Sequence, residues 1–377
     1  MKSKSIFPIL FGFFVMGFVD VVGITTNYVQ KDFQLPDSIA NMLPMAVFLW
    51  FFVCSIPPAM MMNRIGKKHT VLVSMALTFI AMLIPMISYN YPMMLLAFAL
   101  LGISNTILQA ALNPLAATTV RKEMLTSILT WGQFIKAISS FLGPILAGAA
   151  AIYTGQWKQI FTIYAIITLL SLVWTWMSVP NVKEEKQAID IKATFSLFKD
   201  SFIFSLFVGI IMVVGIDVGL NTVIPKILIE KTGMALEQAG LGTSLYFVAK
   251  TAGTFIGALL LAKWSPKGIF RICMVIGLIA LAGMIFGQQS ILMYVLIVVV
   301  GIAYANVFSI IFSNALQYKP ERNNDISALM VMGVSGGALF PPIMGLVSDM
   351  SNQATSLVVL VLGTVYLMMI ALSKKMQ

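Results

Sequence analysis

Four charged side chains lie deep inside long apolar segments of the sequence: Asp20, Lys136, Asp217 and Lys250. A charge at the centre of a bilayer costs roughly 3 kcal/mol on insertion scales, and such residues usually face a cavity or a partner. Carboxylates at this depth can take up and release protons, and ammonium groups can bind an anion or neutralise a carboxylate. This combination is typical of a solute or proton pathway through a membrane.

Polar residues accompany Lys136 on one side of its segment. Gln133, Lys136 and Ser140 fall at spacings that share a helical face, which we expect to line the pathway. Lys136 either binds a carboxylate on the solute, holds Asp20 ionised until solute arrives, or forms a permanent bridge with it. Trp131 precedes this face, and its ring either stacks on a sugar or packs in the core.

Amide side chains form further stripes along the apolar segments. The candidate solute-binding amides are Asn27, Asn105, Gln109, Asn113, Asn221, Asn306 and Asn314. Amides donate and accept hydrogen bonds and therefore suit a polyhydroxylated ligand, although hydrogen bonding between helices is the structural alternative. Asn221 lies one turn after Asp217, and Pro225 lies one turn further, which predicts a kinked or broken helix.

The candidates for proton coupling are Asp20 and Asp217, because they are the carboxylates predicted at mid-membrane depth. Lys250 is either a solute-binding residue or the fixed partner of Asp217. Lys226 lies nearer the outer end of its segment, where its ammonium could reach the interface. One histidine and two cysteines offer no set of metal ligands, so we expect no cofactor, with the proton gradient, or sodium, as the energy source.

These residues must be positioned by membrane-spanning helices. Of the 377 residues, 59% are hydrophobic and 10% are charged, whereas soluble domains carry about 25% charged residues. The apolar segments are long enough to cross about 30 Å of hydrocarbon. We predict an all-α polytopic membrane protein with twelve spans at 6–29, 39–61, 69–88, 92–119, 124–153, 157–179, 201–229, 238–262, 268–288, 290–317, 324–348 and 353–373.

A polar stretch at 180–200 divides the chain into two predicted six-helix bundles, 1–179 and 201–377. The halves echo each other, since Gly-Phe-Val-Asp-Val-Val-Gly at 17–23 resembles Gly-Ile-Asp-Val-Gly at 215–219. Asn105 and Asn113 are spaced like Asn306 and Asn314. These echoes predict pseudo-symmetric bundles with a solute site between them.

The distribution of basic residues predicts the orientation. With both termini in the cytoplasm, the outer loops hold only Lys31, Lys158 and Lys231 of the 24 basic residues. The positive-inside rule favours this arrangement. Because the net charge of +10 is scattered over short loops, we expect no nucleic-acid partner. We expect a monomer in a bacterial inner membrane, with the lipid bilayer and a small-molecule solute as partners.

The loop after the second span carries a recognisable motif. Residues 59–68 read Ala-Met-Met-Met-Asn-Arg-Ile-Gly-Lys-Lys, which resembles the major facilitator superfamily signature Gly-x-x-x-Asp-Arg-x-Gly-Arg-Arg. Ala59 and Asn63 replace the Gly and Asp of that signature. The resemblance implies a conformational latch in which Arg64, Gly66 and Lys67 dock against helix ends of the other half.

Within that superfamily, three segments of the first half resemble the fucose–galactose–glucose:proton symporters. These are Gly17 to Phe33, the run Gln-Ala-Ala-Leu-Asn-Pro at 109–114, and Gly-Gln-Phe-Ile-Lys at 132–136. The second run is similar to Glu-Thr-Ala-Ala-Asn-Pro of the family, and the third to Ala-Gln-Ser-Phe-Asn. The resemblance implies that these segments line a sugar site and that carboxylates on spans 1 and 4 couple transport to protons.

The charges differ from the family pattern. Gln109 stands where the family has its span-4 glutamate, and Gly23 where it has its span-1 aspartate. Asp20 and Lys136 each replace an asparagine. The added lysine suggests an acidic sugar, such as a sialic or uronic acid, as readily as a neutral hexose.

The leading hypothesis is therefore a proton-coupled symporter of a monosaccharide or an acidic sugar, working by alternating access. One alternative is an efflux antiporter for amphipathic compounds. Another is a membrane sensor that binds solute without moving it. The sequence holds no HExxH motif and no nucleotide-binding loop, so an enzyme or an ATP-driven pump is not expected.

Overall fold

The computed structural model describes residues 6–55, 57–119, 122–181, 191–261, 263–319, 322–373 and 376, and they form helices joined by short loops. The first half contains α1 (Ile6–Met16), η2 (Gly17–Val21), α2 (Val22–Phe33), α3 (Asp37–Ala40), α4 (Met42–Val53), α5 (Pro57–Ile65), α6 (Lys67–Ile87), α7 (Tyr91–Thr119), α8 (Lys122–Thr154) and α9 (Gln159–Ser178). Short α10 (Ile191–Ser196) and η3 (Leu197–Lys199) lead into the second half. Part of the predicted linker, 182–190, lies outside the described residues.

The second half contains α11 (Ser201–Thr232), α12 (Leu236–Leu261), α13 (Pro266–Phe286), α14 (Ser290–Tyr304), α15 (Val307–Tyr318), α16 (Asn323–Met332), η5 (Gly333–Ser335), α17 (Gly336–Met350) and α18 (Gln353–Leu372). Within the described residues, 11 helical segments are long and apolar enough to cross a membrane. The shorter apolar stretch Asp37–Val53 supplies one more. These findings are consistent with the predicted twelve-span, all-α fold.

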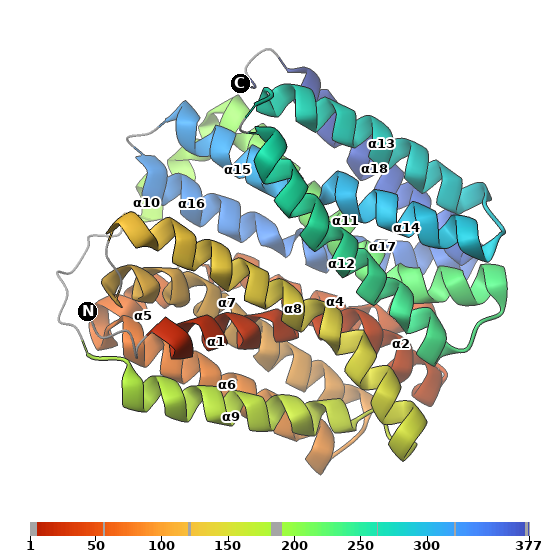
Figure 1. Cartoon of the computed structure of the whole chain (residues 1–377), viewed down its shortest axis with the longest axis horizontal. Coiled ribbons are helices and arrows are strands. Elements are labelled where there is room, and N and C mark those ends of the chain that lie inside the picture. The colour runs from red at the N-terminus through yellow and green to blue at the C-terminus, as the bar shows by residue number, and fades with distance from the viewer. Residues whose placement is uncertain are drawn as a thin grey trace.

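The two halves lie side by side along a central seam (Figure 1). Each has its own apolar core, built around Phe13 and Phe98 in the first half and around Phe270 and Leu281 in the second. Across the seam α11 packs on α2, α12 packs on α8, and α17 packs on both α3 and α4. A site placed on this seam is therefore built from both halves.

In the described parts of the chain, three spans are interrupted near their middles. A 3-10 turn, η2, separates α1 from α2, a short turn separates α14 from α15, and η5 separates α16 from α17. Interrupted helices leave backbone groups available to partners other than their own turns, and such interruptions mark the solute sites of many transporters. In this chain, the interruption of the first span contains Asp20.

Of the kink or break predicted at Pro225, the break is absent, because α11 runs unbroken from Ser201 to Thr232; the kink stays a prediction. Proline removes the hydrogen bond to the carbonyl four residues earlier, which is that of Asn221. In the structure the Thr243 hydroxyl donates to this carbonyl over 3.4 Å. A neighbouring helix therefore supplies the partner that proline removes, and the helix continues.

Candidate functional site

Asp20 is held at the centre of the seam by groups other than a lysine. Its Oδ2 accepts a hydrogen bond from Ser140 Oγ of α8 at 2.5 Å, and its backbone carbonyl accepts from Asn221 Nδ2 of α11 at 2.8 Å. Its side chain is half-buried. Among the described residues no ion pair within 4.0 Å joins Asp20 to Lys136, although the two charges lie close enough to interact. The carboxylate thus has one hydroxyl donor and a lysine at longer range.

Asp217, the matching carboxylate of the second half, has a hydrogen-bond donor at each of its two oxygens. Lys250 Nζ lies 2.6 Å from its Oδ2, and Tyr246 donates its hydroxyl to Oδ1 at 2.5 Å. The side chains of Asp217 and Lys250 are 27% and 28% exposed. Of the two readings of Lys250 left open by the sequence, the structure realises the ion pair with Asp217. The four central charges sum to zero when all are ionised.

Two amides tie the halves together beside Asp20. Asn27 Nδ2 donates to the Thr222 carbonyl at 3.2 Å, while Asn221 reaches the Asp20 carbonyl from the opposite side. Both asparagines are buried, and the Oδ1 atom of each has no hydrogen-bond partner. Gly23 makes room for this crossing, since a Cβ atom there would collide with the Asn221 amide. Gly23 therefore permits the close approach of α2 and α11 at this point.

The amides of the fourth span support the interruption of the first span. Asn105 Nδ2 donates to the Met16 carbonyl at 2.8 Å, just before η2 begins. Gln109 Nε2 in turn donates to Asn105 Oδ1 at 2.9 Å. Asn113, two turns along α7 from Asn105, is exposed. Asn105 and Gln109 thus position the Asp20 turn, whereas Asn113 lies on the surface of its helix.

The stripe predicted on the fifth span lies on α8 and becomes more buried along its length. Trp131 is 55% exposed, and Gln133 is also exposed. Lys136 is intermediate, and Ser140 is buried against Asp20. The stripe therefore runs from the accessible part of α8 to the central carboxylate.

The amides of the tenth span face their own half. Asn306 lies at the turn between α14 and α15, and its Nδ2 donates to the Gly253 carbonyl of α12 at 2.8 Å. Gly257 is packed against the same amide. Asn314 donates to the Ile310 carbonyl in its own helix at 3.0 Å. Both amides are buried, so in this conformation they support helix packing more directly than a central cavity.

The motif of Arg64, Gly66 and Lys67 lies between α5 and α6. Gly66 has a φ of 83°, a left-handed conformation that permits the sharp turn. The neighbouring Lys68 donates to the Trp176 carbonyl at 2.8 Å, in α9 of the same half. The latch onto the other half stays a prediction.

Sequence reasoning missed a second polar cluster that closes the seam. We call it the distal gate; it lies at the end opposite the start of α1, and consists of Gln30, Asp37, Lys226, Ser348 and Gln353. Lys226 is 8% exposed, and its Nζ lies 2.5 Å from Asp37 Oδ1. The prediction that its ammonium reaches the membrane interface is therefore wrong. The sequence did contain a signal for this cluster. Asp37 lies just before the second predicted span, and Lys226 lies at a similar predicted depth in the seventh.

A family model described as Major Facilitator Superfamily matches residues 9–323 and, in a second match, 206–375. The chain is 23% identical over 354 residues to the glucose/galactose transporter of Brucella abortus, covering 89% of this chain and 86% of the relative. It is 26% identical over 369 residues to a putative glucose/galactose transporter of Helicobacter pylori, covering 91% and 89%. A probable sugar efflux transporter of Mannheimia succiniciproducens is 21% identical over 346 residues, covering 86% and 84%.

Solved structures share the fold. The E. coli fucose:proton symporter matches with a TM-score of 0.68 and 16% identity, covering 98% of this chain and 97% of that one. An inward-facing bacterial homologue of the human lysosomal transporter Spinster matches with a TM-score of 0.78 and 14% identity, covering 98% of each chain.

Proposed function

The chain belongs to the major facilitator superfamily, and we propose that it is a secondary transporter of a sugar that works by alternating access and couples transport to a proton at Asp20. The sugar-transporter names of relatives aligned over most of the chain support the solute class. Amides on both sides of the seam, with unpartnered Oδ1 atoms on Asn27 and Asn221, suit a ligand rich in hydroxyls. We further propose that the protein lies in a bacterial inner membrane with both termini in the cytoplasm.

The observation that carries the coupling role is the difference in neutralisation between the central carboxylates. Asp217 has a lysine in direct contact, so its charge already has a partner in its own half. Asp20 has a serine hydroxyl, and it sits in a helix interruption on the seam. A carboxylate with a removable counter-charge can gain and lose a proton as the two halves move.

Transport assays in proteoliposomes test this proposal. Asp20→Asn should abolish uptake of labelled glucose or galactose driven by an inward proton gradient, because the amide cannot carry the proton. The variant should still exchange labelled for unlabelled sugar across the membrane. Equal loss of uptake and exchange would assign Asp20 to sugar binding instead of coupling. Dependence of wild-type uptake on sodium would identify sodium, and not the proton, as the coupling ion.

A second candidate solute is an acidic sugar, and the position of Lys136 favours it. Lys136 is half-buried, lies one turn before Ser140 on α8, and makes no ion pair within 4.0 Å in the described part of the chain. Its ammonium is thus available to a carboxylate on the solute. Lys136→Gln should weaken inhibition by glucuronate or sialic acid by about tenfold and inhibition by glucose by less than about twofold. Equal weakening of both would make Lys136 a structural residue.

A further inference from the structure

The carboxylate of Asp37 occupies a complete binding pocket for a carboxylate. Its Oδ1 accepts from Lys226 Nζ at 2.5 Å and from Gln30 Nε2 at 2.6 Å. Its Oδ2 accepts from Ser348 Oγ and Gln353 Nε2. Asp37 is 6% exposed. One cationic and three neutral donors around two oxygens are the usual chemistry of a buried carboxylate site.

Three of the four donors belong to the second half and are held together without Asp37. Lys226 lies in α11, Ser348 near the end of α17, and Gln353 at the start of α18, and these helices pack on one another. Gln353 Nε2 also donates to Ser348 Oγ at 3.3 Å, and its backbone N–H donates to Glu230 Oε2 of α11 at 2.7 Å. The donor set is therefore part of one bundle and can persist when the seam opens.

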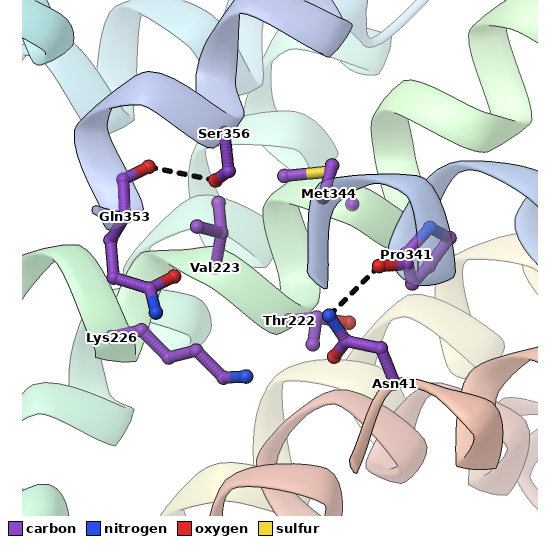
Figure 2. Close-up of a pocket in the computed structure, with 9 residues that line it drawn as sticks. Asn41, Thr222, Val223, Lys226, Pro341, Met344, Gln353 and Ser356 are labelled. Atoms are coloured by element: carbon purple, nitrogen blue, oxygen red, sulfur yellow. Dashed lines mark hydrogen bonds between the residues drawn. The ribbon is translucent and has the colours of Figure 1, made fainter. Parts of the chain in front are cut away.

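Asp37 enters this set from the other half, at the first residue of the four-residue helix α3. Any motion that separates the halves at this end withdraws it. Lys226 and Gln353 line a small cavity of about 10 Å³, enough for one water-sized group. Figure 2 shows their side chains. Asn41 also lines the cavity, and its buried Oδ1 has no hydrogen-bond partner.

We propose that Lys226, Ser348 and Gln353 form a second binding site, which takes the carboxylate of a solute when the distal gate opens and takes the carboxylate of Asp37 when it closes. The two carboxylates exclude each other, so solute binding there favours the open gate. The identity of the natural ligand as an acidic sugar rests on the proposed function. The existence of the site does not, because a simple carboxylate can test it without transport.

Asp349 is a second carboxylate close to this site, and it is the alternative to a solute carboxylate that the test must exclude. Its carboxylate accepts the backbone N–H groups of Asp37 at 2.7 Å and Ser38 at 2.9 Å, and its charge acts on Lys226. Asp349 is exposed, and in the closed gate it is directed to the start of α3. If it moved onto Lys226 whenever Asp37 left, no external carboxylate would be needed.

Chemical rescue tests the site in the purified full-length protein. Asp37→Ala should lower the thermal unfolding midpoint, and sodium acetate should raise the midpoint of this variant by about 2 °C or more above sodium chloride of equal ionic strength. Wild type should show no such difference, because Asp37 fills its own site. Adding Lys226→Met to Asp37→Ala should remove the acetate effect. Equal effects of acetate and chloride on Asp37→Ala, or an acetate effect that survives Lys226→Met, would overturn the proposal.

A second measurement keeps the test decisive if Asp37→Ala does not fold. Asn41→Cys, in a background where Cys54 and Cys273 are alanine, reports opening because Asn41 is 5% exposed in the closed gate. A membrane-impermeant maleimide should label this cysteine several-fold faster in the presence of glucuronate than in the presence of glucose. Ser348→Ala should reduce that difference. Equal labelling with both sugars would contradict a carboxylate site, while uptake of glucose would still support the proposed function.

Discussion

The central carboxylates of the two halves occupy matching places in similar sequences but have different surroundings. Asp217 lies on the unbroken helix α11 and contacts both Lys250 and Tyr246. Asp20 lies in the 3-10 turn η2 and contacts Ser140, with Lys136 beyond ion-pair distance. The comparison shows that residue type and depth do not determine the role of a buried charge, because the neighbouring helix determines whether that charge is permanently neutralised.

The same comparison explains why the halves need not be functionally equivalent. A close lysine makes the Asp217 pair a fixed element of the second bundle, since separating its members leaves an uncompensated charge. Under the proposed function, the more distant lysine of the first bundle leaves Asp20 available to a proton and Lys136 available to a solute. Among the described residues, the second half therefore has a direct ion pair at its central carboxylate, whereas no such pair joins Asp20 to Lys136 in the first half.

The largest expected effect is on stability, when one lysine is removed from each half. Lys250→Met should reduce the free energy of unfolding by about 3 kcal/mol, because it leaves Asp217 partly buried and unneutralised. Lys136→Met should change it by less than about 1 kcal/mol, since no direct pair is broken. Thermal or denaturant unfolding in detergent measures both. Similar losses for the two variants would break the comparison.

A double variant sharpens this prediction. Asp217→Asn combined with Lys250→Met should recover most of the stability lost in Lys250→Met alone, because the unpaired charge is gone. The side-chain oxygen of the asparagine introduced at position 217 can still accept a hydrogen bond from the Tyr246 hydroxyl. No recovery would show that Lys250 acts through packing of its aliphatic chain.

A smaller effect is expected from the glycines that follow the two carboxylates. A methyl group at Gly23 would meet the Asn221 amide and lie 2.8 Å from the Asn221 backbone oxygen, which cannot move freely. A methyl group at Gly219 would meet Met344 Sδ at 2.7 Å and a Leu360 methyl at 2.8 Å, both on flexible side chains. Gly23→Ala should therefore cost about 2 kcal/mol and Gly219→Ala about 1 kcal/mol or less.

The rate of sugar exchange should also distinguish the Gly23→Ala and Gly219→Ala variants. Because Gly23 lies where the halves cross, Gly23→Ala should also slow exchange of sugar across proteoliposomes, whereas Gly219→Ala should leave exchange near the wild-type rate. Adding Asn221→Ala to Gly23→Ala should restore part of the lost stability by clearing the amide. If the two glycine variants behave alike, the crossing of α2 and α11 is not a tight point of the seam.

The twelve spans and the four central charges could be predicted from the sequence, because both follow from hydropathy and length. The turn around Asp20 could not, because it depends on groups distant in sequence, such as the Asn105 amide that satisfies the Met16 carbonyl. The intact helix at Pro225 depends likewise on the Thr243 hydroxyl. Proline positions and hydrophobic periodicity describe a single helix, whereas these two features depend on hydrogen bonds from a neighbouring helix.

The distal gate was missed for a related reason. Lys226 alone resembles a lysine that reaches the interface, and Asp37 alone resembles a loop residue. Their pairing requires that the start of span 2 and the end of span 7 lie at the same depth near each other, which depends on how the two bundles pack. The predicted amide stripes do not stay together in the structure, since Asn306 lies at a turn and Asn314 inside α15, and each donates to a backbone carbonyl.

The smallest and most specific effect should distinguish the hydroxyls that contact the two carboxylates. Ser140 donates to Asp20 at 2.5 Å, and Tyr246 donates to Asp217 at 2.5 Å. Hydrogen-bond donors affect the protonation of a carboxylate, so Ser140→Ala, which removes the hydroxyl donor of Asp20, should change the pH dependence of proton-driven uptake by about one unit. Tyr246→Phe should leave the pH dependence unchanged, because Lys250 still contacts Asp217 and the proposed coupling group is Asp20. A shift produced by Tyr246→Phe, with none from Ser140→Ala, would transfer the coupling role to the second half.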